Sequence, residues 1–179
     1  MTSPLLIRPC AHGDIAALAA VYAWHVRKGT GTFELEAPNA QQLAQRHQQA
    51  KFQGWPWLVA ERASQMIGYA CAQSFRPRAA FGHCVEDSVY VAANCQRQGT
   101  GRLLLAELIA QCKASGATQM IAVIGDAANA GSIGLHRALG FEPAGLLTAV
   151  GWELERWLDV VLMQRRLGMG AESAPRKTV

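Results

Sequence analysis

The stretch Ser-Val-Tyr-Val-Ala-Ala-Asn-Cys-Gln-Arg-Gln-Gly-Thr-Gly, residues 88–101, decides the fold of this chain. Its first four residues predict a β-strand, and an apolar helix follows the turn that contains Gly99 and Gly101. Backbone N–H groups at a helix N-terminus lack partners within the helix, and the helix dipole favours anions there. The stretch therefore indicates a site for phosphate oxygens, although an isolated Gly-x-Gly is also compatible with an ordinary strand–helix turn. Its spacing, Gln-x-x-Gly-x-Gly, matches neither the dinucleotide fingerprint nor a P-loop.

Length and composition favour a single compact domain with a small anionic ligand. The chain has 179 residues, of which 50% are hydrophobic and 17% are charged. A net charge of +4 suits a coenzyme, but it is too small and too dispersed for a nucleic-acid partner.

No metal, disulfide framework or membrane segment is expected. The five cysteines form no C-x-x-C pair and are odd in number, and the five histidines show no zinc spacing. No apolar run reaches the ~18–20 residues of a membrane helix, and the N-terminus lacks the pattern of a signal peptide. We therefore expect a cytoplasmic protein that has no membrane partner.

The hydrophobic pattern predicts elements in the order β-α-α-β-β-β-α-β-α-β-β. The predicted strands are 5–8, 57–61, 66–72, 84–91, 120–124, 145–151 and 156–164, and the predicted helices are 14–26, 39–53 (starting at Pro38 or Asn39), 100–115 and 130–139. The strands on either side of the third helix should be parallel, with a right-handed crossover. This order describes a single-domain α/β fold over residues 1–168, with a mixed central sheet and helices on both faces. Residues 169–179 are expected to form a disordered tail.

A second motif lies in the last predicted helix. Asn129, Ser132 and His136 are spaced i, i+3 and i+7, so all three share one helical face and can line one groove. The alternative for His136 is a surface histidine on an amphipathic helix.

These two motifs resemble those of the GNAT superfamily of N-acetyltransferases, whose members show Asn-x-x-Ala/Ser-x-x-x-Tyr-x-x-x-Gly-Phe in the second motif. Over residues 5–168 the chain more narrowly resembles the phosphinothricin acetyltransferase family, which includes the methionine sulfoximine and methionine sulfone acetyltransferases. The segments that carry this resemblance are 32–34, 75–78, 85–91, 120–125, 132–141 and 156–160.

The resemblance implies a GNAT fold, acetyl-CoA as co-substrate without a metal, and an enzyme that acetylates the α-amino group of a small amino-acid-like compound. It also implies a homodimer. The implied coenzyme-binding residues are Val89, Tyr90, Val91, Arg97, Gln98, Gly99, Thr100, Gly101, Arg102, Asn129 and Ser132. The implied substrate-binding residues are Phe75, Arg76, Pro77, Arg78, Glu86, Asp87 and Ser88.

The chemistry requires a base, because an α-amine is mostly protonated at neutral pH and must lose a proton before it attacks a thioester. In the family a Glu on the strand before the phosphate loop takes this role, and Glu86 matches it. The alternative is that Glu86 is an ordinary solvated carboxylate on a strand. Alternation turns Asp87 to the opposite face unless a β-bulge intervenes. His136 stands where the superfamily usually has a Tyr that protonates the thiolate, so it is the expected second acid or base. The backbone N–H of Tyr90 or Val91 is the expected oxyanion donor.

Two arginines follow the strand that ends near residue 72. Guanidinium groups clamp carboxylates and phosphinates in a bidentate manner, so Arg76 and Arg78 are expected to hold an anionic substrate. The alternative is that both arginines are surface charges or contact the 3′-phosphate of the coenzyme. Trp24, Phe33 and Phe81 are expected either to wall the pocket or to lie in the core.

Three functions remain open at this point. The first is acetylation of a phosphinothricin-like or methionine sulfone-like amine. The second is the same chemistry on a polyamine, an aminoglycoside or a protein N-terminus. The third is a non-catalytic acyl-CoA-binding module. Cys84 is expected to be an inert thiol, because the superfamily transfers acetyl directly.

Overall fold

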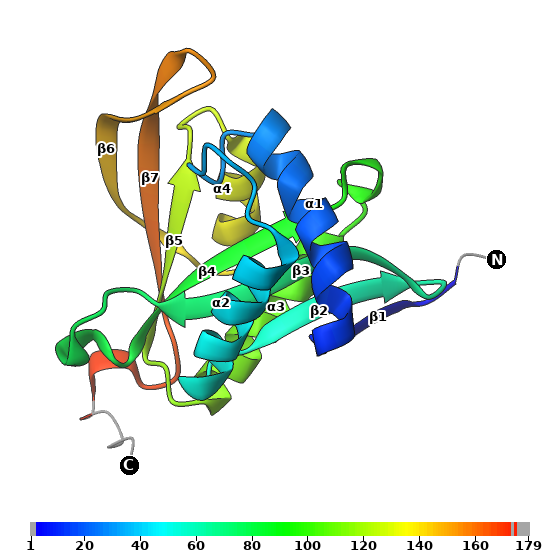
Figure 1. Cartoon of the computed structure of the whole chain (residues 1–179). Helices are drawn as coiled ribbons and strands as arrows, with labels where there is room; N and C mark the ends of the chain where they lie inside the picture. The colour runs from blue at the N-terminus through cyan, green and yellow to red at the C-terminus, as the bar shows by residue number, and fades with distance from the viewer. Residues whose placement is uncertain (1–2, 173, 175–179) are drawn as a thin grey trace.

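The computed structural model describes residues 3–172 and residue 174, and its centre is a seven-stranded sheet with the order β1-β2-β3-β4-β5-β7-β6 (Figure 1). The strands are Leu5–Pro9 (β1), Trp57–Arg62 (β2), Gln65–Ser74 (β3), Cys84–Val91 (β4), Gln119–Gly125 (β5), Glu142–Glu153 (β6) and Arg156–Arg166 (β7). Only β4 and β5 pair in parallel; the other neighbours are antiparallel. The mixed sheet and its parallel pair confirm the predicted α/β class.

Four α-helices cover both faces of this sheet, as predicted. They are Ile15–Lys28 (α1), Ala40–Phe52 (α2), Thr100–Ala114 (α3) and Ala130–Ala138 (α4), and short 3-10 turns lie at His12–Asp14, Ala79–Phe81, Ala93–Cys95 and Gly170–Glu172. In Figure 1, α1 and α2 lie in front of β2–β4, whereas α3 lies behind them. Asn39, one of the two predicted starts of α2, is its N-cap and accepts a hydrogen bond from the backbone N–H of Gln42.

The core fills both faces of the sheet, under α1 and α2 on one face and under α3 on the other. Leu104, Leu105 and Leu108 on α3 are completely buried, and each contributes about 2 kcal/mol by removing its side chain from water. Cys112 on the same helix is also buried, and all five cysteines are free thiols. The helix that follows the phosphate-type loop is therefore held rigidly against the sheet.

Strand β4 is regular throughout its pairing with β3. The register runs without a shift from Ser74↔Val85 to Gly68↔Val91. No bulge therefore relaxes the alternation of side chains in this pair, and Glu86 and Asp87 lie on opposite faces of the sheet.

The hairpin of β6 and β7 departs most from the predicted boundaries. β6 begins at Glu142, three residues before the predicted start at Gly145, and it includes Pro143. Pro143 is tolerated because β6 is an edge strand, where one side of the ladder needs no partner. The register shifts twice, between Pro143 and Gly145 and between Leu147 and Gly151.

The tail predicted to be disordered lies only partly within the described residues. Gly170–Glu172 form a 3-10 turn, and Glu172 pairs with Arg166 on β7. Residues 173 and 175–179 lie outside the described part of the chain.

Candidate active site

The site starts where β4 and β5 separate. The two strands pair only from Cys84↔Gln119 to Asp87↔Ala122, and beyond this point they diverge (Figure 1). The N–H of Ala92 donates to the carbonyl of Ile67 on β3, so alternation turns the N–H of Tyr90 towards β3 and that of Val91 into the gap. Of the two expected oxyanion donors, Val91 is the one that faces the gap.

The loop before α3 forms the second part of the site. Gly99 is the N-cap of α3 with φ of 83°, a left-handed conformation that glycine adopts without strain, and no side chain caps the helix. The first N–H groups of α3 therefore point out of the helix end without a helical partner. Together with the helix dipole they form an anion site.

A cavity of about 980 Å³ extends from this loop to the gap between β4 and β5, and it reaches residues on both faces of β4. Most of the expected site residues line it: Phe75, Arg76, Pro77, Glu86, Asp87, Ser88, Val89, Tyr90, Val91, Arg97, Gly99, Gly101, Arg102, Asn129, Ser132 and His136. Its walls come from α1, α2, the loop of residues 29–34, β3, β4, β5 and α4.

Three of the expected residues do not line the cavity. Gln98 accepts a hydrogen bond from Arg62 at 2.8 Å, which turns its side chain to the outer surface. The side chain of Thr100 is buried, because the first turn of α3 packs on the sheet, so only its backbone N–H is left for an anion. Arg78 precedes the turn Ala79–Phe81 and lies outside the cavity walls.

Glu86 lies on the face of β4 that α1 and α2 cover. Gln73, its partner on β3, donates a hydrogen bond to it at 3.4 Å. Burial raises the pKa of the Glu86 carboxyl, and the neighbouring Arg76 opposes part of that rise. A carboxylate with a raised pKa at the edge of a cavity has the properties of a general base.

Asp87 lies on the other face, in contact with His136 on α4. His136 Nε2 is 3.0 Å from Asp87 Oδ2, and both side chains are buried. Asp87 was expected among the substrate-binding residues; the alternation of β4 turns it away from the Glu86 face and towards His136 instead. Nδ1 of His136 lies 2.7 Å from the backbone carbonyl of Ser132, so both ring nitrogens are engaged.

Asn129 joins α4 to the end of β5. Its side-chain oxygen accepts a hydrogen bond from the N–H of Ser132 as the N-cap of α4, and its amide nitrogen lies 3.5 Å from the carbonyl of Gly125. This cap fixes the start of α4, and thereby the positions of Ser132 and His136, relative to the gap.

Of the two arginines, Arg76 alone lines the cavity. Its guanidinium lies over the ring of Phe75, 4.7 Å from the centroid, and it stands on the same side as Glu86. Among the expected aromatic walls, Trp24 and Phe33 line the cavity, whereas Phe81 does not.

One group of site residues was not found by sequence reasoning. Glu34 accepts hydrogen bonds from Tyr22 at 2.8 Å and from Arg46 at 2.6 Å, which ties the loop of residues 29–34 to α1 and α2. All three residues line the cavity. The signal in the sequence was weak, because the three residues come from separate elements and no fixed spacing relates them.

The loop of residues 29–34 also packs on two glycines. A β-carbon at Gly125, at the end of β5, would overlap the backbone carbonyl of Thr30, and one at Gly151 would overlap the ring of Phe33. Phe33 itself has φ of 54°, which is uncommon for a bulky residue. These contacts hold the loop as a preformed wall on the Glu86 side of the cavity.

Within the described residues, no group of histidine, cysteine, aspartate and glutamate side chains has the arrangement of a metal site. None of the described helices is both long enough and apolar enough to span a membrane.

Comparison with known proteins gives a consistent result. The model of the Acetyltransferase (GNAT) family matches residues 18–141. Phosphinothricin N-acetyltransferase of Alcaligenes faecalis is 44% identical over 169 residues, which cover 94% of this chain and 86% of that protein. L-methionine sulfoximine/L-methionine sulfone acetyltransferase of Pseudomonas aeruginosa is 39% identical over 163 residues, covering 90% of this chain and 94% of that protein.

The solved structures agree with this result. The crystal structure of a GNAT superfamily phosphinothricin acetyltransferase from Sinorhizobium meliloti in complex with AcCoA superposes with a TM-score of 0.93. It is 40% identical, and the match covers 100% of this chain and 96% of that one.

Proposed function

Because the chain belongs to the Acetyltransferase (GNAT) family, we propose that Glu86, Arg76 and the gap between β4 and β5 form its catalytic centre. The protein is an acetyl-CoA-dependent N-acetyltransferase that acts on small amino-acid-like substrates. Phosphinothricin, methionine sulfoximine and methionine sulfone are the proposed acceptors. The observation that carries the assignment of the site is the position of Glu86, on the last part of β4 before β5 diverges.

The residues present fit the coenzyme. The N–H groups at the start of α3 suit its phosphates, with Arg97 and Arg102 adding positive charge beside them. The backbone of Val89 and Val91 faces the gap and offers hydrogen bonds to an amide-containing arm, and Asn129 lies across the gap. When bound, acetyl-CoA supplies a thioester whose carbonyl carbon accepts the amine.

The acceptor is proposed to bind on the Glu86 side. Arg76 attracts the acidic group of an amino-acid-like compound, and Glu86 removes a proton from its amine. The N–H of Val91 stabilises the negative charge that develops on the carbonyl oxygen. The loop of residues 29–34 closes this side of the cavity, which favours a small acceptor over a polypeptide. Acetylation would neutralise such an amine, so we also propose a role in resistance to compounds of this class.

A thiol-release assay with acetyl-CoA tests this function. We expect turnover of at least one of phosphinothricin, methionine sulfoximine and methionine sulfone, with spermidine, an aminoglycoside and an alanine-terminated peptide as comparison acceptors. Turnover of the comparison acceptors alone would refute the proposed substrate class, and no turnover of any acceptor would refute the proposed catalytic centre.

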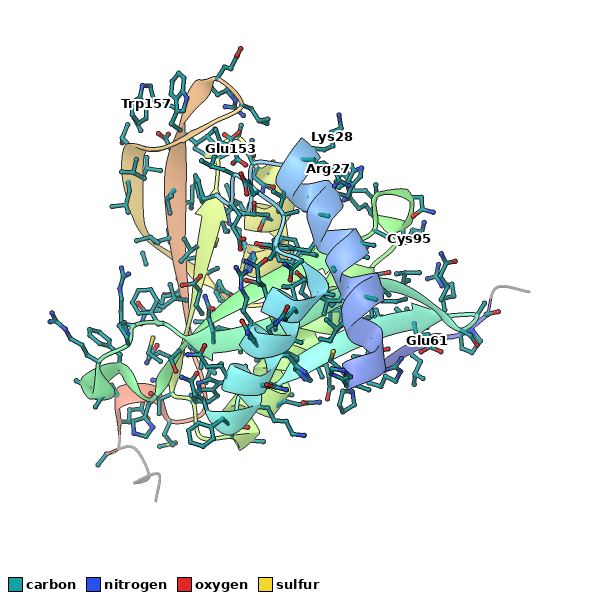
Figure 2. The ribbon with its side chains drawn as sticks, viewed as in Figure 1. Arg27, Lys28, Glu61, Cys95, Glu153 and Trp157 are labelled. Carbon is teal, nitrogen blue, oxygen red and sulfur yellow. The ribbon has the colours of Figure 1, made fainter. Side chains whose placement is uncertain are left out.

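We also propose a homodimer that forms through the β6–β7 hairpin. The apolar side chains exposed there are Leu146, Leu147, Val150, Trp152, Leu154 and Trp157. In Figure 2, Trp157 lies at the outer end of the hairpin, away from the helices. Such a patch on an edge strand suits a self-complementary contact between two copies.

Light scattering during gel filtration tests the dimer. Leu147→Asp together with Trp157→Ser should convert a dimer to a monomer. Phe52→Ser, which changes an apolar residue that is 94% exposed at the end of α2, should leave the mass unchanged. A monomeric wild-type protein would refute this proposal.

A cytoplasmic location completes the proposal. Acetyl-CoA is an intracellular metabolite, and five free thiols suit a reducing compartment. Fractionation of cells that express the protein tests it, and recovery of the protein outside the cytoplasmic fraction would contradict it.

A further inference from the structure

The hydrogen bonds around His136 determine where its protons lie. Nδ1 is 2.7 Å from the carbonyl oxygen of Ser132, and because a carbonyl only accepts, Nδ1 must carry a hydrogen. The hydroxyl of Ser132 lies 3.4 Å from the same Nδ1. It can only accept there, so its own hydrogen is left to be donated elsewhere.

The other ring nitrogen shares a proton with Asp87. Nε2 is 3.0 Å from Oδ2 of Asp87, and the exposed fractions of the two residues are 4% and 7%. With Nδ1 already protonated, a proton on Nε2 makes the ring a cation that faces a carboxylate. Burial lowers the pKa of His136, but the hydrogen bond and charge of Asp87 outweigh it, and the net pKa is raised.

Few other titratable groups act on this pair. Cys112 on α3 and Cys71 on β3 lie near Asp87, and burial raises the pKa of Cys112 to about 12 and that of Cys71 further. Both thiols therefore stay neutral around pH 7. Glu86, the adjacent residue on β4, is the remaining group, and it lies on the opposite face of the strand.

The geometry points to Ser132 as the proton donor to the leaving sulfur, with His136 and Asp87 behind it as a relay that supplies the proton. All three residues line the cavity. Asp87 is the last residue of β4 that pairs with β5, so the relay lies where the gap opens. This inference rests on the proposed acetyl transfer, and it makes Ser132 a catalytic residue and Asp87 a positioning residue.

The proton count closes over one turnover. The amine arrives as an ammonium ion and first loses one proton through Glu86 to water. Its nitrogen then forms the bond to the acetyl carbon, and Glu86 receives the second amine proton. The carbon–sulfur bond breaks with its electron pair on sulfur, and Ser132 gives that sulfur its hydroxyl proton. Ser132 Oγ takes the proton from Nδ1 of His136, which leaves a neutral ring with its proton on Nε2 beside Asp87. Water then returns one proton to the ring and removes one from Glu86.

Substitution of Ser132 tests the donor. Ser132→Ala keeps the backbone cap but removes the hydroxyl, so kcat should fall about ten- to hundredfold while the KM for acetyl-CoA changes less than about twofold. Ser132→Thr should restore most of the rate. Gly134→Ala is the control on the same helix, because an added β-carbon has no neighbour within 4 Å, and it should leave kcat unchanged. A wild-type kcat in Ser132→Ala overturns the proposal.

The protonation state of His136 can be measured without any turnover. Protein labelled with ¹⁵N-histidine should show both ring nitrogens of His136 protonated at pH 7 in the wild type. In Asp87→Asn the amide can donate to Nε2, so the ring should be neutral and keep its proton on Nδ1. A wild-type ring that is neutral at pH 7 overturns the relay, whether or not the protein acetylates any acceptor.

The pH profile gives a third measurement. The relay needs the doubly protonated ring, so kcat should decline as pH rises through the pKa of His136. Asp87→Asn removes the group that raises this pKa, and the decline should move to lower pH by about one unit. Asp14→Asn breaks a different Asp–cation pair, with Arg8, and should leave the profile in place. An unchanged profile in Asp87→Asn shows that Asp87 acts only on stability and overturns its assigned role.

Discussion

Glu86 and Asp87 are neighbours in the chain, yet they occupy two different environments. Glu86 lies on the α1/α2 face of β4, beside Arg76 and the cavity, with a single hydrogen bond to a side chain, from Gln73. Asp87 lies on the α3/α4 face and is buried against His136. A carboxylate near a cavity can exchange its proton with a substrate, whereas a carboxylate paired with a buried imidazole controls that imidazole. In the proposed mechanism, one strand thus supplies the base for the attacking amine and the carboxylate behind the donor to the leaving sulfur.

The largest expected effect comes from removing the base on the Glu86 face. Glu86→Gln keeps the shape of the side chain but cannot accept a proton, so kcat should fall about 10²–10³-fold. The thiol-release rate at saturating substrates measures it, and the KM for acetyl-CoA should stay within about twofold. A fall in kcat of less than about threefold would mean that another group is the base. Glu86 and Asp87 would then no longer have the distinct roles compared above.

Arg76 should show the next largest effect, confined to the acceptor. Arg76→Gln removes a charged hydrogen-bond donor, so the KM for an anionic acceptor should rise about ten- to hundredfold. Arg78→Gln is the matched control, because Arg78 does not line the cavity, and its KM should change less than about twofold. Equal effects from both substitutions would mean that the loop acts through its overall charge.

The packing of the loop of residues 29–34 on Gly125 should contribute to the stability of the protein. In Gly125→Ala the new methyl group meets the carbonyl of Thr30, so unfolding free energy should fall by about 1–3 kcal/mol. Gly134→Ala, in the interior of α4 with open space around it, should instead stabilise by roughly 0.5–1 kcal/mol. Denaturant unfolding compares the two. If Gly125→Ala is as stable as the wild type, the loop is not packed as a fixed wall.

The smallest expected effect is a displacement of the acidic side of the pH profile. Burial raises the pKa of Glu86, so kcat/KM should rise with pH through a value above that of a free glutamate. Arg76 lowers this pKa, and Arg76→Gln should therefore move the rise to higher pH by roughly half a unit. A shift to lower pH would contradict the assignment of this side of the profile to Glu86.

Much of the fold was predictable because β4, α3 and β5 each follow one simple pattern. The apolar run of β5 predicts a central strand, and the glycines after β4 mark the start of α3. The start of β6 was predicted three residues late, at Gly145, since Pro143 breaks an interior strand but not an edge strand.

The site was predicted less completely than the fold. Glu86, Arg76 and His136 follow from the family resemblance and line one cavity. The pairing of Asp87 with His136 joins residues 49 positions apart, and the contact of Glu34 with Arg46 depends on a loop held by tertiary packing. No local spacing encodes either contact, so both required the three-dimensional structure.

The unbroken register of β4 also limits how this protein can change over evolutionary time. Inserting or deleting one residue between Cys84 and Glu86 would exchange the faces of the two carboxylates and should abolish both proposed roles at once. The β6–β7 hairpin already contains two register shifts, and it lies outside this alternation. Insertions and deletions should therefore be tolerated in the hairpin, whereas this part of β4 should change only by substitution.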